Sequence, residues 1–377
     1  MTGVALKVVT FACNHSRLGG DNMSMLGAIE GLQQRGITST VILPEKGDIE
    51  EKLRKNNVRY TIIRSSVFKK TSKFSILLTL LKYLSFIIKS KSDILHSNDV
   101  YCNKFMTISG KLFRKKTVCH VRFKVNDKII DYYLSPQPDY VVFNSMFMER
   151  EFFHSCSGLK LNSKTTVIYN PLLTENYYKP HLRMSMRNQW KAEDQFVVCI
   201  VGNISEQKGH LEFVESAKNL LKFKDDFLFV VVGKDTSGDN KNLETVVNMV
   251  ENYGLGDNFI FHGVAEDMGK VFAGVDLLLF PSHFESFGRV AVESLLAGVP
   301  VVASRVGGLI EILDGNPAAK LVDVGDVDGF VNAVLFMRDS DHGAGKNIIL
   351  EQGKRIIEEK FSFNKSISDL LNIYRND

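Results

Sequence analysis

The sequence lacks the features that mark secreted disulfide-rich, zinc-binding and membrane-spanning proteins. Its five cysteines are an odd number, and none forms a C-x-x-C pair, so neither a disulfide framework nor a zinc site is expected. No segment offers about 18 uninterrupted apolar residues, so no membrane-spanning helix is expected. The apolar amino terminus has no charged leader region and no small-residue cleavage site, which predicts a first strand and not a signal peptide. Together these absences predict reduced, structural thiols in a cytoplasmic protein.

Two ligand classes are also unsupported by the sequence. There is no G-x-G-x-x-G fingerprint, so a nicotinamide dinucleotide is not expected. The acidic segment from Asp323 to Gly329 lacks the D-x-D-x-D-G spacing and the distal glutamate of a calcium loop. We interpret this segment as a strand-to-helix loop in which aspartates cap the helix. We therefore expect neither a metal site nor a bound cofactor.

The chain of 377 residues is long enough for two domains, and its 44% apolar and 24% charged residues are ordinary globular values. The net charge of +4 conceals an uneven distribution. The first 170 residues contain 26 Lys and Arg against 13 Asp and Glu, whereas the rest contains 21 against 30. The basic half favours an anionic ligand or surface, and charge complementarity between the domains is the alternative. No nucleic acid partner is expected.

Short apolar segments alternate with helical patterns along the whole chain. After the first segment, apolar residues recur at three- and four-residue steps until Gly36, as in a helix that ends at a glycine. Near-continuously apolar strands separated by helices predict parallel sheets covered on both faces, and hence two Rossmann-like α/β domains. The predicted strands are residues 5–12, 39–44, 58–63, 93–98, 116–121, 139–145, 196–203, 227–233, 258–263, 276–282, 299–304 and 318–324.

The segment 167–180 is rich in Asn, Pro and Tyr, and we interpret it as the linker between the two halves. We therefore place an N-terminal domain at residues 1–172 and a C-terminal domain at residues 173–358. For residues 359–377 we expect a C-terminal helix that packs back toward the N-terminal domain.

Ligands of open parallel sheets bind beyond the carboxyl ends of the strands, so we searched the strand-to-helix loops. After the first strand, Gly19 and Gly20 let backbone N–H groups approach a ligand, and the next helix presents its positive end to an anion. A plain tight turn with Asp21 as the helix cap is the alternative. In the second half, Lys208 begins a helix, where its ammonium would add to amides that favour a phosphate. A solvated lysine is the alternative there.

A third loop carries two carboxylates, Glu285 before a predicted helix and Glu293 within it. The helix is expected to begin near Phe287 or Gly288. Eight residues of helix span roughly 12 Å, about the distance from a sugar ring to a ribose across a diphosphate. Each carboxylate can accept two hydrogen bonds from a vicinal diol, and an unpartnered carboxylate among apolar residues is costly. The alternatives are a favourable interaction of Glu285 with the helix dipole and a buried ion pair for Glu293.

Residues 283–313 resemble the donor-site signature of the family 4 retaining glycosyltransferases, which have the GT-B fold. Glu285 and Glu293 match the family's Glu-x7-Glu pair. The segment 202–209 is similar to its G-R-x-x-x-x-K-G loop, except that Asn203 replaces the arginine. The resemblance covers nearly the whole chain and is looser in the N-terminal domain. There, Gly19 and Gly20 match the family's Gly-Gly loop, and His120 aligns with a histidine after a mid-domain strand.

The resemblance implies two Rossmann-like domains facing across a cleft, with the acceptor on the N-terminal domain and the nucleotide sugar on the C-terminal one. Glu285 is expected to hold donor-sugar hydroxyls, Glu293 the ribose diol, and His120 the sugar near the reacting carbon. The diphosphate is expected to bind Lys208 without Mg²⁺. Asn203 removes one cation of the family pattern, for which Arg289 or Arg122 is the candidate replacement. The backbone amides expected at the diphosphate are those of Gly19, Gly20, Phe287, Gly288 and Arg289.

The implied activity is that of a retaining, hexosyltransferase-type glycosyltransferase. It would move a sugar from a nucleotide-diphosphate sugar, foremost a UDP-sugar, to a glycan or lipid-linked glycan acceptor in bacterial surface polysaccharide, lipopolysaccharide or glycoconjugate assembly. Two alternatives stay open. One is a catalytically silent GT-B subunit that binds nucleotide sugars, which only Asn203 favours. The other is a GT-B sugar-nucleotide epimerase.

Residues 73–91 form a nearly all-apolar helical pattern with one narrow polar stripe. This is more apolar surface than contact with a single sheet needs. A helix wedged between the sheet and a neighbouring element is one interpretation. The other is partial insertion at an anionic membrane, which would place the protein peripherally on the inner face of the cytoplasmic membrane. The polar stripe comprises Ser75, Thr79, Lys82, Ser85 and Lys89, and the flanking lysines are Lys69, Lys70, Lys73, Lys89 and Lys91.

Overall fold

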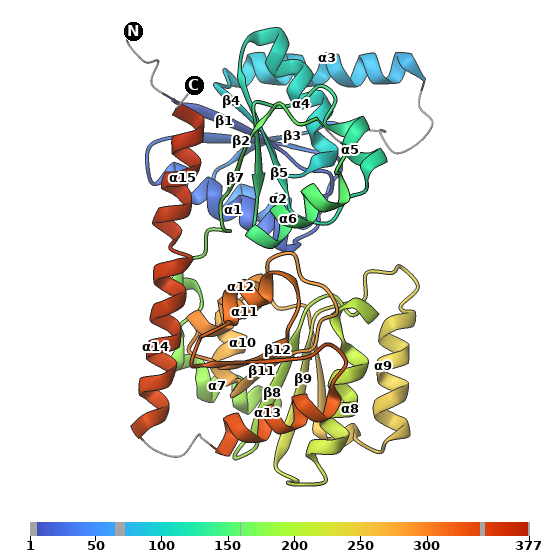
Figure 1. Cartoon of the computed structure of the whole chain (residues 1–377), viewed down its shortest axis with the longest axis vertical. Helices are drawn as coiled ribbons and strands as arrows, with labels where there is room; N and C mark the ends of the chain where they lie inside the picture. The colour runs from blue at the N-terminus through green and yellow to red at the C-terminus, as the bar shows by residue number, and fades with distance from the viewer. Residues whose placement is uncertain (1–5, 65–71, 159, 340–343, 376–377) are drawn as a thin grey trace. The chain divides into compact units, whose positions relative to one another are not determined.

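The computed structural model describes residues 6–64, 72–158, 160–339 and 344–375. The chain divides into two compact units, and each is described by itself (Figure 1). Unit 1 comprises Met1–Leu172 and Phe361–Asp377, and unit 2 comprises Leu173–Lys360. The chain ends in two helices, and the second of them corresponds to the predicted C-terminal helix. The first, α14 (Ala344–Lys360), belongs to unit 2, and the second, α15 (Phe363–Arg375), belongs to unit 1.

Unit 1 is built on a seven-stranded sheet, in the order β3-β2-β1-β4-β5-β6-β7, with every strand parallel to its neighbours. The order reverses between β1 and β4, so the loops after these two strands flank the topological switch point, where such sheets bind ligands. The strands are β1 (Val8–Ala12), β2 (Thr38–Leu43), β3 (Arg59–Ile62), β4 (Ile94–Ser97), β5 (Lys116–Val121), β6 (Tyr140–Phe143) and β7 (Lys164–Val167). The helices are α1 (Gly20–Gln33), α2 (Ile49–Lys55), α3 (Lys73–Ser90), α4 (Val100–Phe113), α5 (Asp127–Tyr133), α6 (Met146–Ser155) and α15.

Unit 2 repeats this architecture with a six-stranded parallel sheet in the order β10-β9-β8-β11-β12-β13. Its switch point lies between β8 and β11. The strands are β8 (Phe196–Val201), β9 (Phe227–Val232), β10 (Phe259–Gly263), β11 (Leu277–Phe280), β12 (Val301–Ser304) and β13 (Ala319–Val322). The helices are α7 (Arg183–Trp190), α8 (His210–Leu220), α9 (Lys241–Asn252), α10 (Met268–Gly274), α11 (Arg289–Leu296), α12 (Gly307–Leu313), α13 (Val327–Asp339) and α14, with 3-10 helices η1 (Thr174–Asn176), η2 (Pro180–Leu182), η3 (Glu206–Lys208) and η4 (Gly256–Asn258).

Burial of both sheet faces explains why the strands are continuously apolar. All six residues of β9 are buried, because helices cover a parallel sheet on both sides. Each of the twelve predicted strands is present, whereas β7 was missed. Its first two residues are exposed and its last two half-buried, so this edge strand has no apolar pattern to detect. All five cysteines are buried and free.

Helix α3 buries only one narrow side of its mostly apolar surface. Thr79, Tyr83, Ile87 and Ser90 are buried, and Tyr83 and Ile87 join a core cluster with residues of α4. Within the polar stripe of the sequence, Thr79 is therefore buried, whereas Lys82, Ser85 and Lys89 are exposed. The apolar side chains left exposed are Phe74, Ile76, Leu77, Leu78, Leu81 and Ile88. In the part of the chain that the structure describes, no helix combines the length and apolar character needed to cross a membrane.

Candidate functional site

Lys208 and Glu285 meet at the switch point of unit 2. Lys208 is the last residue of η3, after β8, and Glu285 lies in the loop after β11. The Nζ atom of Lys208 donates a hydrogen bond to Oε1 of Glu285, and the hydroxyl of Ser282 lies 3.3 Å from the same oxygen. The side chains are 24% and 10% exposed. The pair is thus largely removed from solvent but still reachable by a ligand.

Two glycines shape the loops that carry these side chains. Gly209 has a φ of +73°, and a Cβ atom there would overlap the carbonyl oxygen of Pro281, directly after β11. This close approach packs the Lys208 turn against the loop that carries Glu285. Gly288, the N-cap of α11, has a φ of +95°, and a Cβ there would lie 2.6 Å from Cδ2 of Leu309. Both positions favour glycine because other residues enter the left-handed region only at a cost.

Glu293 has protein partners within unit 2. Nε of Arg289 donates to Oε1 of Glu293 over 2.6 Å, and the hydroxyl of Tyr177 lies 3.1 Å from the same oxygen. A guanidinium nitrogen of Arg289 also donates to the Tyr177 oxygen over 2.9 Å. Burial and the Glu293 carboxylate raise the pKa of the Tyr177 phenol, so it stays protonated. The structure thus contains the buried ion pair that was one of the two interpretations of Glu293. Because Arg289 is bound to Glu293 and Tyr177, its guanidinium is not available to replace the cation that Asn203 removes.

The remaining predicted donor residues of unit 2 differ in exposure. Asn203 is exposed in the loop after β8, whereas Phe287 is 2% exposed. Helix α11 begins directly after Gly288, within four residues of Glu285. Its first-turn amides, beginning with that of Arg289, therefore belong to the same strand-loop-helix segment as Glu285.

The glycine pair of unit 1 forms the start of α1. Gly19 is the N-cap, with extended backbone and no side-chain cap, and the helix begins at Gly20. Asp21 is therefore in the first turn and is not the cap. Its Oδ2 lies 2.9 Å from Nε2 of His15. Burial acts to raise the pKa of Asp21, but the hydrogen bond and charge of His15 lower it overall, and the same hydrogen bond raises the pKa of His15.

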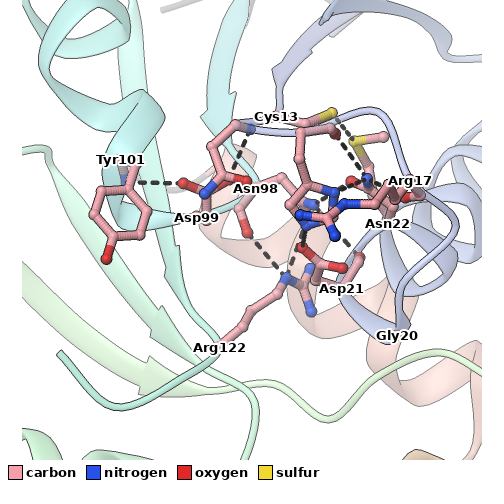
Figure 2. A network of polar contacts seen from close by, with 12 residues as sticks. Cys13, Arg17, Gly20, Asp21, Asn22, Asn98, Asp99, Tyr101 and Arg122 are labelled. Atoms are coloured by element: carbon pink, nitrogen blue, oxygen red, sulfur yellow. Dashed lines mark hydrogen bonds and ion pairs between the residues drawn. The ribbon is translucent and has the colours of Figure 1, made fainter. Parts of the chain in front are cut away.

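Arg122 is fixed at the carboxyl end of β5, next to the unit 1 switch point (Figure 2). Its Nε donates to the backbone and side-chain oxygens of Asn98 over 3.0 and 3.1 Å, and another guanidinium nitrogen donates to Oδ1 of Asn170 over 2.7 Å. The Asn98 amide in turn donates to Oδ1 of Asn22 over 3.1 Å. Arg122 is 6% exposed. This network therefore ties the ends of β4 and β5 to the first turn of α1.

Asp99, the residue after Asn98, is the N-cap of α4 and is fully buried. One carboxylate oxygen accepts from the backbone N–H of Asn14 over 3.1 Å, and the other accepts from that of Tyr101 over 2.8 Å (Figure 2). Burial and the nearby charge of Asp21 raise the pKa of Asp99 to about 6. The two backbone N–H donors partly offset the free-energy cost of burying the Asp99 carboxylate.

His120 lies near the end of β5 and is 6% exposed. It lines a small cavity of unit 1 together with Ser24, Arg122, Asn170 and Ser366. Burial, with the charge of Arg122, holds the pKa of His120 well below its ordinary value. The imidazole is therefore neutral near pH 7, which suits a hydrogen-bonding contact more than an electrostatic one.

Sequence analysis missed several residues that hold these sites. Asn98 ends a predicted strand and Asp99 directly follows it, so their position at a strand-to-helix loop was a usable signal. Tyr177 lies in the linker segment, where nothing in the local sequence indicates a contact with Glu293. Among the described residues, no group of three or more His, Cys, Asp and Glu side chains is arranged to hold a metal ion.

Comparison with known proteins finds a family match in the C-terminal half of the chain. Residues 183–349 match the model of the family described as Glycosyl transferases group 1. The N-acetyl-alpha-D-glucosaminyl L-malate synthase of Bacillus anthracis is 25% identical over 217 residues, which are 57% of this chain and 55% of that protein. The lipopolysaccharide core biosynthesis mannosyltransferase LpsB of Rhizobium meliloti is 27% identical over 212 residues, 52% of this chain and 60% of that protein.

The matches to curated relatives are partial. They span between 28% and 64% of the relatives' own lengths. Solved structures match over nearly the whole chain but at low identity. Anabaena Alr3699/HepE in complex with UDP has a TM-score of 0.82 and 19% identity, covering 98% of this chain and 100% of that one. A glycosyltransferase of Rickettsia africae has a TM-score of 0.84 and 19% identity, covering 98% of both chains.

The fold and the family match agree. The two parallel-sheet units are those of GT-B glycosyltransferase structures, and the residues that gather at the unit 2 switch point lie within the segment that matches the family. Residues 183–349 of this protein accordingly resemble the group 1 glycosyltransferases, and the chain has the GT-B fold.

Proposed function

We propose that this protein is a retaining glycosyltransferase. It transfers a sugar from a nucleotide-diphosphate sugar, foremost a UDP-sugar, to a glycan or lipid-linked glycan acceptor in bacterial surface polysaccharide or glycoconjugate assembly. The proposal is supported by the Lys208–Glu285 pair at a topological switch point, inside the segment that matches the group 1 glycosyltransferases. The UDP in a structure of HepE and the mannosyltransferase named among the relatives favour the same chemistry.

The ion pair suggests how the donor binds. Without a ligand, Lys208 and Glu285 neutralise each other. A diphosphate carries more negative charge than one carboxylate and offers several oxygens, so it competes with Glu285 for the ammonium. Once Lys208 turns to the diphosphate, Glu285 is free to accept hydrogen bonds from sugar hydroxyls. Breaking the bond between the sugar and the diphosphate then places negative charge where Lys208 and the α11 amides stabilise it.

The other predicted donor contacts are part of this proposal. Glu293 is assigned to the ribose diol. Its ion pair with Arg289 and its contact with Tyr177 hold the carboxylate oriented before the nucleotide arrives. From unit 1 we assign Gly19, Gly20 and His120 to the donor. We propose that phosphate charge is neutralised without a metal ion, since a lysine and helix N-termini supply positive potential of their own.

A transfer assay tests the proposal. The protein is screened by thermal shift against UDP-, GDP- and dTDP-sugars, and the stabilising donors are then supplied radiolabelled with glycan and lipid-linked acceptors. Lys208→Met should abolish stabilisation by the donor. The matched control is Lys224→Met, which removes a lysine of the same unit from an exposed pair with Asp339. Stabilisation by a donor without transfer to any acceptor would instead indicate a binding subunit, and conversion of the donor sugar would indicate an epimerase.

We also propose that helix α3 contacts an anionic membrane surface. Its exposed side chains Phe74, Leu77, Leu78, Leu81 and Ile88 lie at spacings of three, four or seven residues and form one apolar face. The sequence from Lys52 to Ser92 contains eleven Lys and Arg and no Asp or Glu. An apolar face within a wholly basic segment fits anionic lipid better than it fits a neutral partner. Lys69 and Lys70, which the sequence also indicated, lie outside the described residues.

A further inference from the structure

Three buried side chains of unit 1 form a series of hydrogen bonds that ends at His120. The Tyr374 hydroxyl, on α15, lies 2.5 Å from Nδ1 of His96 in β4. Nε2 of His96 lies 2.7 Å from Nδ1 of His120 in β5. The side chains are 4%, 1% and 6% exposed in that order. Tyr374 is 278 positions from His96, so this contact depends entirely on the docking of α15.

Two independent contacts fix α15 against the rest of unit 1. Nζ of Lys116, on β5, donates to the carbonyl oxygens of Ile373 and Tyr374, over 3.2 Å in each case. These carbonyls lie in the last turn of α15, where helical partners are lacking and a cation is favourable. Nearer the start of α15, Gly31 of α1 leaves room for Ile367, which a Cβ atom at Gly31 would overlap. The hydroxyl of Tyr374 is therefore held in place by the packing of its helix.

The protonation states of the three groups follow from their burial. Burial raises the pKa of the Tyr374 phenol well above its ordinary value. Burial, and to a lesser extent the charge of Arg122, lowers the pKa of both His96 and His120 well below the ordinary value. Near pH 7 the phenol keeps its proton and each imidazole carries one. Three protons are thus available for two hydrogen bonds.

Two proton arrangements satisfy both hydrogen bonds. In the first, Tyr374 donates to His96 Nδ1, His96 Nε2 donates to His120 Nδ1, and the proton of His120 is on Nε2. In the second, every donor is reversed, and the phenol proton is left without an acceptor, since among the described residues Tyr374 has no other side-chain hydrogen bond. A buried donor without a partner is costly, whereas a hydroxyl oxygen that only donates is common. The first arrangement is therefore favoured.

We propose that Tyr374 and His96 are positioning residues that hold His120 as the tautomer with its proton on Nε2. In the part of the chain that the structure describes, no hydrogen-bond partner of that nitrogen is found. His120 is then a hydrogen-bond donor that selects an oxygen lone pair, on a phosphate or a sugar hydroxyl, and Nε2 cannot act as a base. Arg122, which lines the same cavity, favours the same electron-rich partners. This inference deepens the proposed function, because the ligand oxygen belongs to the proposed sugar donor.

The tautomers are measured directly by ¹⁵N NMR of the whole protein labelled on histidine, with His120→Gln used to assign the His120 signals. We expect His120 in the wild type to show a protonated Nε2 and an unprotonated Nδ1. In Tyr374→Phe, which keeps the ring and removes the donor, a second tautomer of His120 should appear. The matched control is Tyr83→Phe, because Tyr83 is a tyrosine of the same unit that is only 2% exposed. It should leave the His120 signals unchanged.

Turnover provides the second measurement. Losing one oriented hydrogen bond should lower kcat for sugar transfer about tenfold in Tyr374→Phe. Its melting temperature should fall below that of Tyr83→Phe, because Nδ1 of buried His96 loses its partner. A protonated Nδ1 on His120 in the wild type would overturn the proposal, even if no variant folds. Identical His120 signals in Tyr374→Phe and the wild type would also overturn it. If the tautomers are as expected but the wild type transfers no sugar, the positioning of His120 by Tyr374 and His96 stands and the proposed function fails.

Discussion

Lys208 and Glu285 lie 77 positions apart in the sequence, yet the lysine ammonium donates a hydrogen bond directly to the glutamate carboxylate. Each side chain leaves the carboxyl end of a different strand, and these strands, β8 and β11, are neighbours in the sheet. The pair therefore joins the two loops on either side of the switch point. Because each charge is the other's partner, a change at one residue alters the availability of the other, which makes their separate roles measurable.

Glu285→Gln should separate turnover from nucleotide affinity. The substitution keeps the shape of the side chain but removes the charge that holds Lys208, so UDP should bind at least as tightly as to the wild type. Turnover should fall about 10- to 100-fold, as expected for the loss of charge-assisted hydrogen bonds to the sugar. Isothermal titration with UDP and steady-state transfer kinetics measure the two effects. Glu215→Gln, at an exposed partner of Tyr253, is the control, and a collapse of UDP affinity in Glu285→Gln would contradict the assignment.

Glu293→Gln should reduce both stability and nucleotide affinity. It leaves the buried Arg289 without its charged partner, which should cost about 3 kcal/mol of unfolding free energy. The double variant Arg289→Met with Glu293→Gln removes that unpaired charge and should recover part of the stability. If Glu293 binds the ribose, the double variant should still bind UDP weakly. Chemical denaturation measures the stability of each variant, and titration measures its UDP affinity. If the double variant recovers UDP affinity together with stability, the Glu293 carboxylate is only structural.

Sugar transfer should survive removal of divalent metal ions. The proposed site neutralises phosphate charge with Lys208 and the N-terminus of α11, and these need no ion. We expect the initial rate in excess EDTA to stay within about twofold of the rate with Mg²⁺, since electrostatic stabilisation by the protein is retained. The measurement compares EDTA, EDTA followed by excess Mg²⁺, and no addition. A complete loss of activity in EDTA that Mg²⁺ restores would disprove the metal-free mechanism.

Binding to anionic vesicles should depend on two separable features of α3. Lys73→Glu with Lys89→Glu should weaken binding at low salt by at least about tenfold, because each basic residue near an anionic surface contributes on the order of 1 kcal/mol. Leu77→Ser with Leu81→Ser should remove the part that persists at high salt, where charges are screened within about 10 Å or less. Lys222→Glu with Lys241→Glu, in unit 2, is the control. Failure of the wild type to sediment with anionic vesicles would rule out the membrane contact.

Asp99 should make the protein less stable as the pH rises from about 4 to about 6. Its pKa in the folded protein is about 6, against about 3.9 in an unfolded chain. Between these values the folded state binds the extra proton, so the stabilising contribution of protonation is lost as the pH increases. Asp99→Asn lacks this titration. The difference in unfolding free energy between wild type and variant should therefore move by about 2 kcal/mol against the wild type between pH 4 and pH 7. A constant difference would contradict the shift.

Local sequence was sufficient for the architecture and for the position of the strand-to-helix loops that carry the candidate site. Parallel strands covered on both sides must be apolar throughout, so all twelve predicted strands could be recognised from short apolar segments. The loops with Gly19, Lys208 and Glu285 were recognised because polar residues and glycines follow such strands. The edge strand β7 was missed for the same reason, since its side chains are half exposed and carry no apolar pattern.

The partners of the site residues were decided only by the tertiary structure. Apolar periodicity shows where a helix or strand is, but it does not encode strand order or the docking of distant segments. The contact of Tyr177 with Glu293 spans 116 positions, and that of Tyr374 with His96 spans 278. The buried side of α3 is a similar case. Most of its side chains are apolar, so burial of Tyr83 and exposure of Leu77 depend on where the sheet and α4 lie, and not on the pattern within the helix.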